Sequence, residues 1–280
     1  MSDFNLLGVV IAYNPEDCFI DNISTYIDSL SELLVIENSK LDHAEKEKLN
    51  SLYPGKIVYK SLGGNSGISM PLNFALAYCG KNKYTHLLTM DQDSSFPPGA
   101  FNSFLDTSKL MFQLDHKVCL CAPSIPVNGV DLNKDNGGLF ITSGNLINIS
   151  RLGGISYDEN LFIDGVDFDL CMSIQKANLQ AVKISNSIMK HNLGDSINYK
   201  LFNVSLISTN HSVIRLYYIF RNYSYLIFKS NSKGFRYKLV KLLVQFLFAI
   251  IFKEDDKIVR FKFAFTGLYD SFTKNMGRKY

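Results

Sequence analysis

Leu6-Leu7-Gly8-Val9-Val10-Ile11-Ala12 is an unbroken apolar run, and the turn-forming Tyr13-Asn14-Pro15 follows it at once. A run of this length is typical of a strand buried on both faces, as the strands of parallel sheets are. Similar runs follow at residues 33–36, 57–59 and 86–90. Helix-length stretches separate them, so the sequence predicts a β-α-β-α-β order and a wound, mostly parallel sheet.

The second half of the chain has a mixed pattern, and its first part continues the sheet. It predicts a strand at residues 118–122, a strand pair at residues 139–142 and 146–149, a helix opening near Asp167 and a strand near residues 181–184. From about residue 211 apolar residues recur at helical spacing. We therefore expect a catalytic domain over residues 1–210 and a helical, basic region over residues 211–280.

The composition places the chain among ordinary folded proteins. The 280 residues are 46% hydrophobic and 20% charged, which excludes a disordered chain. The five cysteines form neither a CxxC pair nor a Cys/His cluster, and the first residues lack the features of a secretory signal. We therefore expect a cytoplasmic protein with reduced thiols.

Charge is distributed unevenly along the chain. Residues 215–280 contain 14 Lys and Arg against four Asp and Glu, a net charge of +10, whereas residues 1–214 carry −7. A basic, aromatic tail favours an anionic partner. Because bulky aliphatic residues are interleaved with the basic ones, and no nucleic-acid-binding motif accompanies them, we expect no nucleic acid partner.

Residues 235–252 combine a basic first half with an apolar second half. A transmembrane helix needs about 20 predominantly apolar residues, and residues 242–252 supply only 11. An interfacial helix with Arg236, Lys238 and Lys241 near lipid headgroups fits better. We therefore expect peripheral attachment to the cytoplasmic membrane surface. The alternative is packing against the catalytic domain or against a second subunit of a homo-oligomer.

Two acidic clusters are candidates for chemistry. Asp91 and Asp93 follow a predicted strand, and Mg²⁺ is usually held by one or two carboxylates together with substrate phosphates. Residues 164–169 hold three more carboxylates where a loop is predicted to meet a helix, and a carboxylate near a metal-bound phosphate can act as a general base. A capped turn and a favourable helix dipole are the purely structural interpretations of the two clusters.

Three further features point to the same region. Polar clusters stand at three predicted strand ends, at residues 13–15, 37–39 and 91–94, and ligands of wound sheets bind at such ends. The Gly-rich residues 63–67 match neither a GxGxxG nor a Walker A motif, so they indicate close backbone approach to a ligand rather than dinucleotide or P-loop binding. The imidazole of His191 can complete a metal site.

Taken in order, these motifs resemble the family 2 glycosyltransferases, and the bacterial rhamnosyltransferases are the closest subgroup. The resemblance covers residues 6 to about 195 and continues into the helical region. It rests on Ala12-Tyr13-Asn14-Pro15, Val35-Ile36-Glu37-Asn38-Ser39, Gly64-Asn65-Ser66-Gly67-Ile68, Met90-Asp91-Gln92-Asp93-Ser94, Phe162 to Asp169, His191, Arg215-Leu216-Tyr217-Tyr218 and Arg221-Asn222.

The resemblance implies a GT-A fold, a Rossmann-like wound mixed sheet with a C-terminal helical appendage, and a nucleotide-sugar donor with Mg²⁺ or Mn²⁺. It implies Asp167 as the catalytic base and Asp93 and His191 as metal ligands. It further implies nucleotide or substrate contacts from Tyr13, Asn14, Glu37, Asn65, Gly67, Asp91 and Asp169. Glu37 stands where the family usually has Asp, and Ser173 stands where many members have Arg, which leaves the donor open.

The expected activity is inverting transfer of L-rhamnose from dTDP-rhamnose to a lipid-linked or growing bacterial surface polysaccharide, such as O antigen, at the inner face of the cell membrane. A galactofuranosyl or N-acetylglucosaminyl transferase that uses a UDP-sugar is the alternative within the class. Outside it stand a noncatalytic nucleotide-sugar-binding scaffold and a nucleotidyltransferase. The latter usually has a Gly-rich, basic triphosphate loop near its N-terminus, and residues 10–16 do not form one.

Overall fold

The computed structural model describes residues 4–127, 130–133, 139–191, 197–201, 204–208 and 211–280. The chain divides into two compact units. The first unit contains residues 1–157 and 170–192, and the second contains residues 158–169 and 193–280. This division groups residues by contact, so the functional boundary that we predicted at residue 210 stays a prediction.

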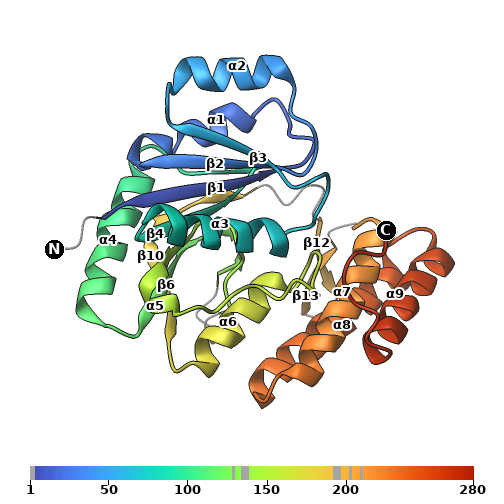
Figure 1. Ribbon diagram of the computed structural model, residues 1–280. Coiled ribbons are helices and arrows are strands. Elements are labelled where there is room, and N and C mark those ends of the chain that lie inside the picture. The colour runs from blue at the N-terminus through green and yellow to red at the C-terminus, as the bar shows by residue number, and fades with distance from the viewer. Residues whose placement is uncertain (1–3, 128–129, 134–138, 192–196, 202–203, 209–210) are drawn as a thin grey trace. The chain divides into compact units, whose positions relative to one another are not determined.

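The first unit is built on one mixed sheet of seven strands (Figure 1). In sheet order they are β10 (Gln180–Ile188), β6 (Val118–Ser124), β9 (Asn145–Asn148), β4 (His86–Asp91), β1 (Leu6–Ala12), β2 (Glu32–Glu37) and β3 (Ile57–Ser61). Neighbouring strands pair in parallel except at β9, which is antiparallel to both β4 and β6. The predicted wound mixed sheet is therefore confirmed.

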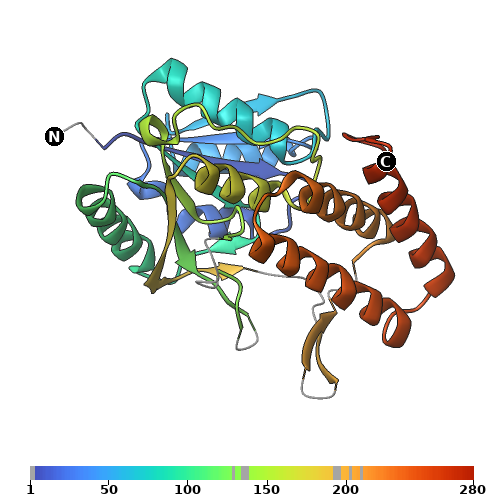
Figure 2. The ribbon, with the colours of Figure 1, turned by 90° about the horizontal axis from the view of Figure 1, so that it is seen from below.

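Helices cover both faces of this sheet because β1 is apolar on both. Leu6 and Val10 belong to a core shared with helices α1 (Phe19–Ser24) and α4 (Ala100–Leu114), whereas Leu7 and Val9 are buried on the opposite face of the strand. Helix α3 (Ser69–Asn82) lies on the other side of the sheet from α1 (Figure 2). The helical elements of this part of the chain are α1 (Phe19–Ser24), the 3₁₀ turn η1 (Ile27–Ser29), α2 (His43–Leu52), α3 (Ser69–Asn82), α4 (Ala100–Leu114), α5 (Ile149–Leu152) and α6 (Val166–Lys176), whose first turn is counted with the second unit.

Two local predictions were wrong. The helix-length stretch between the first two predicted strands does not form one long helix. Helix α1 ends at Ser24, because the hydroxyls of Ser24 and Thr25 donate to nearby carbonyl oxygens and compete with helix continuation. Residues 139–142 form no strand. The Thr89 hydroxyl donates to the carbonyl oxygen of Thr142 at 2.6 Å, which holds this segment as a turn beside β4. Only β9 forms, and it pairs with β4 and β6 instead.

Three short antiparallel pairs complete the strands. Their members are β5 (Ser94–Ser95) with β11 (Lys190–His191), β7 (Pro126–Val127) with β8 (Val130–Asp131), and β12 (Ile197–Leu201) with β13 (Val204–Ser208). The pair β5–β11 joins segments about a hundred residues apart in sequence. It determines where the metal-site candidate His191 lies.

The second unit contains three long helices, α7 (Val213–Lys229), α8 (Lys233–Phe252) and α9 (Lys257–Phe272). Helices α7 and α9 approach closely at Gly267, where an added Cβ would lie 2.4 Å from the carbonyl oxygen of Tyr217. No helix within the described part of the chain is long and apolar enough to span a membrane.

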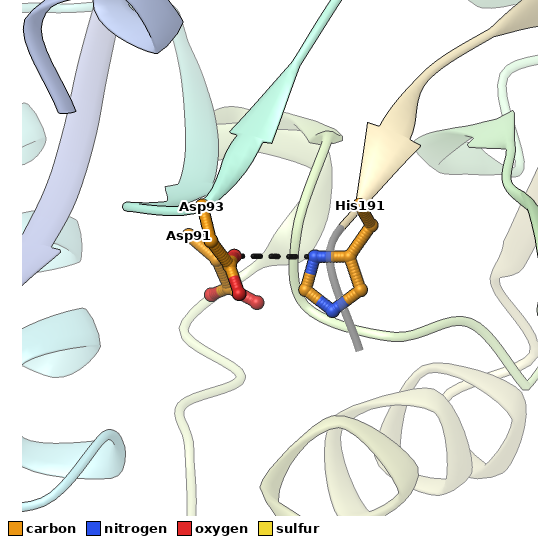
Figure 3. Close-up of side chains that lie close together, drawn as sticks. All are labelled: Asp91, Asp93 and His191. Carbon is orange, nitrogen blue, oxygen red and sulfur yellow. Dashed lines mark ion pairs between the residues drawn. The ribbon is translucent and has the colours of Figure 1, made fainter. Parts of the chain in front are cut away.

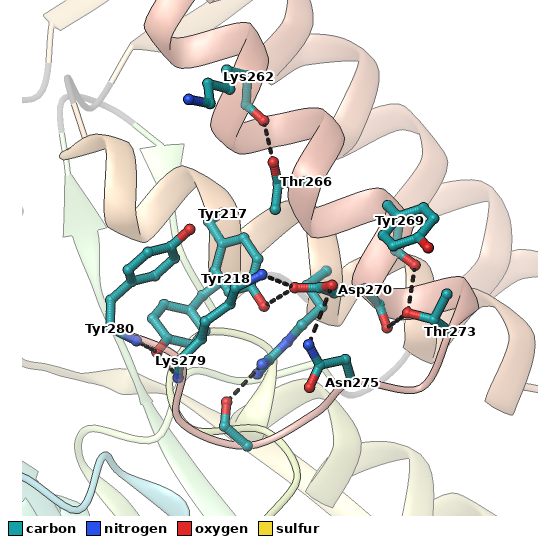
Figure 4. Close-up of polar contacts among 12 residues, drawn as sticks. Tyr217, Tyr218, Lys262, Thr266, Tyr269, Asp270, Thr273, Asn275, Lys279 and Tyr280 are labelled. Atoms are coloured by element: carbon teal, nitrogen blue, oxygen red, sulfur yellow. Dashed lines mark hydrogen bonds and ion pairs between the residues drawn. The ribbon is translucent and has the colours of Figure 1, made fainter.

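A buried polar cluster holds residues 275–280 against α7 and α9 (Figure 4). The Tyr217 hydroxyl donates to Asp270 Oδ2 at 2.6 Å, and the Lys279 ammonium lies 2.5 Å from the same oxygen. The Tyr218 hydroxyl accepts hydrogen bonds from the backbone N–H groups of Lys279 and Tyr280. The pKa of Tyr217 is raised by burial and by its bond to Asp270, so the phenol stays protonated.

Candidate active site

The polar strand ends of the first unit meet at one edge of the sheet. The parallel register places Ala12 beside Glu37, Ile11 beside Asp91, and Glu37 beside Ser61. The carboxyl ends of β1, β2, β3 and β4 are therefore neighbours. This is the arrangement that we predicted for the polar clusters after β1, β2 and β4.

Asp91, Asp93 and His191 form a cluster with the composition of a metal site (Figure 3). Each offers a ligand atom, and these atoms all lie within 4.8 Å of one another. His191 Nδ1 lies 3.3 Å from Asp93 Oδ1. Asp91 is the last residue of β4, and His191 is brought to it because β11 pairs with β5, with His191 opposite Ser94.

Two serines that we did not predict connect the cluster. The N–H of Asp91 donates to Ser143 Oγ at 3.0 Å, and Ser143 Oγ donates to Ser94 Oγ at 2.8 Å. Ser94 Oγ in turn lies 2.7 Å from His191 Nδ1, and both hydroxyls are buried. This series of hydrogen bonds fixes the imidazole of His191 relative to the end of β4. Serine is too common for sequence alone to have shown this, although Ser94 directly follows the carboxylate pair.

The residues present fit a hard divalent cation. Asp93 Oδ1 is buried and accepts no hydrogen bond from any residue that the structure describes. A buried carboxylate oxygen without a hydrogen bond is costly, and a cation would relieve that cost. Two carboxylates and one imidazole suit Mg²⁺ or Mn²⁺ rather than a thiolate-seeking metal.

Tyr13 and Asn14, predicted to contact the nucleotide, lie in the turn after β1. The side chain of Gln92 holds the turn, because its Oε1 accepts from the N–H of Tyr13 at 2.8 Å and its Nε2 donates to the Tyr13 carbonyl at 3.1 Å. Asn14 has a φ of 44° and its N–H donates to Ser39 Oγ at 2.6 Å. The ring of Tyr13 is exposed, so it is accessible to a ligand.

Glu37, predicted to contact the nucleotide, already has partners at the end of β2. The Lys46 ammonium lies 2.7 Å from its Oε1, and the N–H of Leu41 donates to the same oxygen at 3.2 Å. Both partners come from α2 and the loop before it. A nucleotide base that binds here would meet a carboxylate whose charge is partly offset by lysine.

Asn65 and Gly67 lie in a Gly-rich loop that a buried side chain fixes. Asn38 Nδ2 donates to the Gly67 carbonyl at 2.6 Å, and Asn38 Oδ1 accepts from the N–H and the hydroxyl of Ser66. Asn65 Oδ1 accepts from the N–H of Gly67 at 3.0 Å. Gly67 has a φ of 76°, which L-residues rarely adopt. In the sequence, Asn38 stood out only as a member of the motif Glu37-Asn38-Ser39, and its contacts with the Gly-rich loop were not predicted.

Asp167 and Asp169 lie in the first turn of α6, within the second unit. Asp167 is half-buried, and its Oδ1 accepts from the N–H of Phe168 at 2.9 Å. Asp169 is buried with 2% of its surface exposed, and its Oδ1 lies 2.7 Å from the Lys229 ammonium. Burial raises the pKa of Asp169, and Lys229 opposes that rise. The predicted contact of Asp169 with the nucleotide stays a prediction.

No family model matches the chain. It is 25% identical over 255 residues, 81% of each protein, to the dTDP-rhamnosyl transferase RfbF of Shigella flexneri. Among solved structures it is similar to the mannosyltransferase PcManGT of Pyrobaculum calidifontis in complex with GDP-Man and Mn²⁺. That match has a TM-score of 0.60 and 13% identity, and covers 97% of this chain and 86% of the other. Residues 1–349 of S. aureus TarS match with a TM-score of 0.55 and 14% identity, covering 95% and 80%.

The solved structures confirm the GT-A fold. Together with the curated relative, they support the resemblance to the family 2 glycosyltransferases, near the rhamnosyltransferases. They also support glycosyltransferase activity for this chain.

Proposed function

We propose that this protein is an inverting, metal-dependent glycosyltransferase that transfers L-rhamnose from dTDP-rhamnose to a lipid-linked or growing bacterial surface polysaccharide, such as O antigen. The observation that carries the proposal is the cluster of Asp91, Asp93 and His191 at the carboxyl end of a parallel strand. The dTDP-rhamnosyl transferase of Shigella flexneri supports the choice of donor.

Asp91, Asp93 and His191 would hold Mg²⁺ or Mn²⁺. A divalent cation supplies charge that offsets the negative charge of a departing nucleoside diphosphate. The turn with Tyr13 and the loop with Gly67 would contact the nucleoside, since both border the same sheet edge. Their backbones are held by Gln92, Ser39 and Asn38, so the nucleoside meets a preformed surface.

Asp167 would act as the general base. It takes the proton of the acceptor hydroxyl as the hydroxyl oxygen bonds to the anomeric carbon, while the bond from that carbon to the diphosphate oxygen breaks on the opposite face. One such displacement inverts the anomeric centre. Asp164 and Asp169 flank Asp167, and their carboxylates lie in ion pairs with Arg215 and Lys229 respectively.

A donor screen tests the proposal. Thermal shifts with dTDP, UDP and GDP, each with and without Mn²⁺ or Mg²⁺, should show the largest metal-dependent stabilisation with dTDP, and dTDP-rhamnose should turn over. A preference for UDP would instead indicate a galactofuranosyl or N-acetylglucosaminyl transferase. Nucleotide binding without turnover of any donor would indicate a noncatalytic scaffold.

Two substitutions separate the assigned roles. Asp167→Asn should bind nucleotide and metal like the wild type and lose transfer, because an amide cannot accept the acceptor's proton. Asp93→Asn should weaken the metal-dependent part of nucleotide binding. Asp106→Asn is the matched control, since Asp106 is exposed on α4. Normal transfer by Asp167→Asn would refute the assignment of the base.

We also propose that helix α8 attaches the protein to the inner face of the cell membrane, where a lipid-linked acceptor would lie. One face of α8 exposes large apolar side chains at helical spacing, namely Tyr237, Val240, Val244, Phe248, Ile251 and Phe252. Lys241 lies on the same face, and Arg236 is also exposed. An apolar face with flanking basic residues suits an anionic bilayer.

Vesicle sedimentation tests this attachment. Binding to vesicles with anionic lipid should exceed binding to purely zwitterionic vesicles, and Phe248→Glu should abolish it. Leu110→Glu, at a comparably exposed leucine of α4, should bind like the wild type. A Phe248→Glu variant that changes only the oligomeric state would show that a second copy covers this face instead.

A further inference from the structure

Helix α7 carries three polar residues at a spacing of seven, close to two helical turns: Arg215, Asn222 and Lys229. At 3.6 residues per turn, residues seven apart lie on one face of a helix. All three side chains contact residues 158–169, the segment that leads into α6 and carries Asp167 in its first turn. Both elements belong to the second unit.

We call Arg215, Asn222 and Lys229 the α7 row. Its middle residue makes the most specific contacts. Asn222 is fully buried, and its Nδ2 donates to the carbonyl oxygens of Ile163 at 2.6 Å and Asp164 at 2.8 Å. Its Oδ1 accepts from Arg221 Nε at 2.9 Å, which fixes the orientation of the amide. The two donors therefore point at two consecutive carbonyl groups of the loop.

These carbonyls lie in a turn that needs external support. Asp164 has a φ of 60° and Gly165 a φ of 84°, which is the left-handed region that favours glycine. Arg215 Nε and Nη2 both lie 3.1 Å from Asp164 Oδ1. The next helical hydrogen bond begins at once, because the N–H of Asp169 donates to the carbonyl of Gly165. The turn thus sets the direction in which α6 starts.

The outer end of the row fixes the same segment from both sides. The Lys229 ammonium lies 2.7 Å from Asp158 Oδ2 and 2.7 Å from Asp169 Oδ1. It therefore ties the start of the loop to the first turn of α6. The Tyr225 hydroxyl, also on α7, donates to Asp158 Oδ2 at 3.0 Å.

We propose that the row Arg215–Asn222–Lys229 is a positioning device for Asp167, with Asn222 as its principal positioning residue. The inference rests on the proposed function of Asp167 as the base. It assigns a role to Arg215 and Asn222, which belong to sequence motifs that the metal and nucleotide sites leave unexplained. General-base catalysis requires the base to be held within hydrogen-bond reach of the proton that it removes.

The test uses the full chain with Asn222→Asp, which keeps the shape of the side chain but replaces both amide donors with an acceptor. Lys229→Gln is a second, partly exposed position in case the first variant does not fold. Arg260→Gln is the matched control, because it removes a buried ion pair with Glu254 in the same unit. The first readout is hydrogen–deuterium exchange of peptides that cover residues 158–170.

Exchange in this segment should rise at least several-fold in Asn222→Asp and in Lys229→Gln, and stay at the wild-type rate in Arg260→Gln. Unchanged exchange in both row variants would overturn the proposal. This readout needs no enzymatic activity. A wild type that transfers no sugar, but shows the exchange response, would refute the proposed function and leave the structural role of the row intact.

The second readout is kinetic. The turnover number of Asn222→Asp should fall about 10–100-fold, whereas binding of the nucleotide with Mn²⁺ should stay unchanged. In an Asp167→Glu background, where the base is already displaced, Asn222→Asp should lower the turnover number by a much smaller factor. Equal losses in both backgrounds would show that Asn222 acts on general stability and not through the base.

Discussion

His86 should make the first unit sensitive to acid. It is buried at the start of β4, stacked on Phe4 with ring centroids 4.1 Å apart. Asn148 Nδ2 faces His86 Nε2 at 3.1 Å, and the Thr85 hydroxyl faces His86 Nδ1 at 2.9 Å. Asn148 Oδ1 accepts from the N–H of Arg151, so the amide presents its donor to the ring, and Nε2 must be an acceptor.

Burial, together with the nearby cations Arg151 and Lys109, lowers the pKa of His86 from 6.5 to about 4. Between about pH 4 and pH 6.5 the unfolded chain therefore binds a proton at His86 that the folded chain does not bind. The stabilising contribution is fully present above pH 6.5 and is lost as the pH falls from 6.5 towards 4. Between pH 7.5 and pH 5.0 the free energy of unfolding should fall by about 2 kcal/mol from this residue alone.

Urea unfolding at the two pH values measures this loss. His86→Gln removes the titrating group, so its stability difference between pH 7.5 and pH 5.0 should be about 2 kcal/mol smaller than that of the wild type. His43→Gln, at an exposed imidazole of α2, should retain the wild-type difference. An undiminished difference in His86→Gln, or an NMR titration of His86 near 6.5, would refute the reasoning.

Three further predictions concern single contacts. Gly144→Ala should lower the unfolding free energy by about 2–4 kcal/mol in urea titrations, because φ is 81° and the new Cβ would lie 2.7 Å from the Pro123 ring. Asp42→Ala should cost about 1 kcal/mol in the same assay, because it removes the capping box of α2. Ser94→Ala should weaken Mn²⁺ binding about 10–100-fold by calorimetry, and Ser95→Ala should leave it unchanged. Equal Mn²⁺ affinity in both serine variants would show that the contact to His191 does not orient the imidazole.

The sheet was largely predictable because its strands are apolar on both faces. The runs at residues 6–12, 33–36 and 86–90 form strands, because a strand inside a mostly parallel sheet covered on both faces buries all of its side chains. The failure at residues 139–142 has a different cause. The hydroxyl of Thr89 donates a hydrogen bond to the carbonyl oxygen of Thr142, and a hydrophobic pattern carries no information about such a bond.

The residue types of the candidate site could be predicted from the sequence, but the hydrogen bonds that hold those residues in place could not. The structure brings Asp91, Asp93 and His191 together, as the family motifs suggested. The contacts that hold them run through Ser94, in the two-residue strand β5, and Ser143, in the turn before β9, and neither segment is long enough to show a periodicity. The seven-residue spacing on α7 was present in the sequence, but its partners could be identified only from the fold.

The two-residue pairing of β5 with β11 has a consequence for biosynthesis. The carboxylates leave the ribosome long before the imidazole does, since His191 follows Ser94 by 97 residues. A nascent chain therefore lacks one member of the candidate metal site until nearly all of the first unit has been synthesised. The proposed cation binding should accordingly be a late event and a reporter of completed assembly.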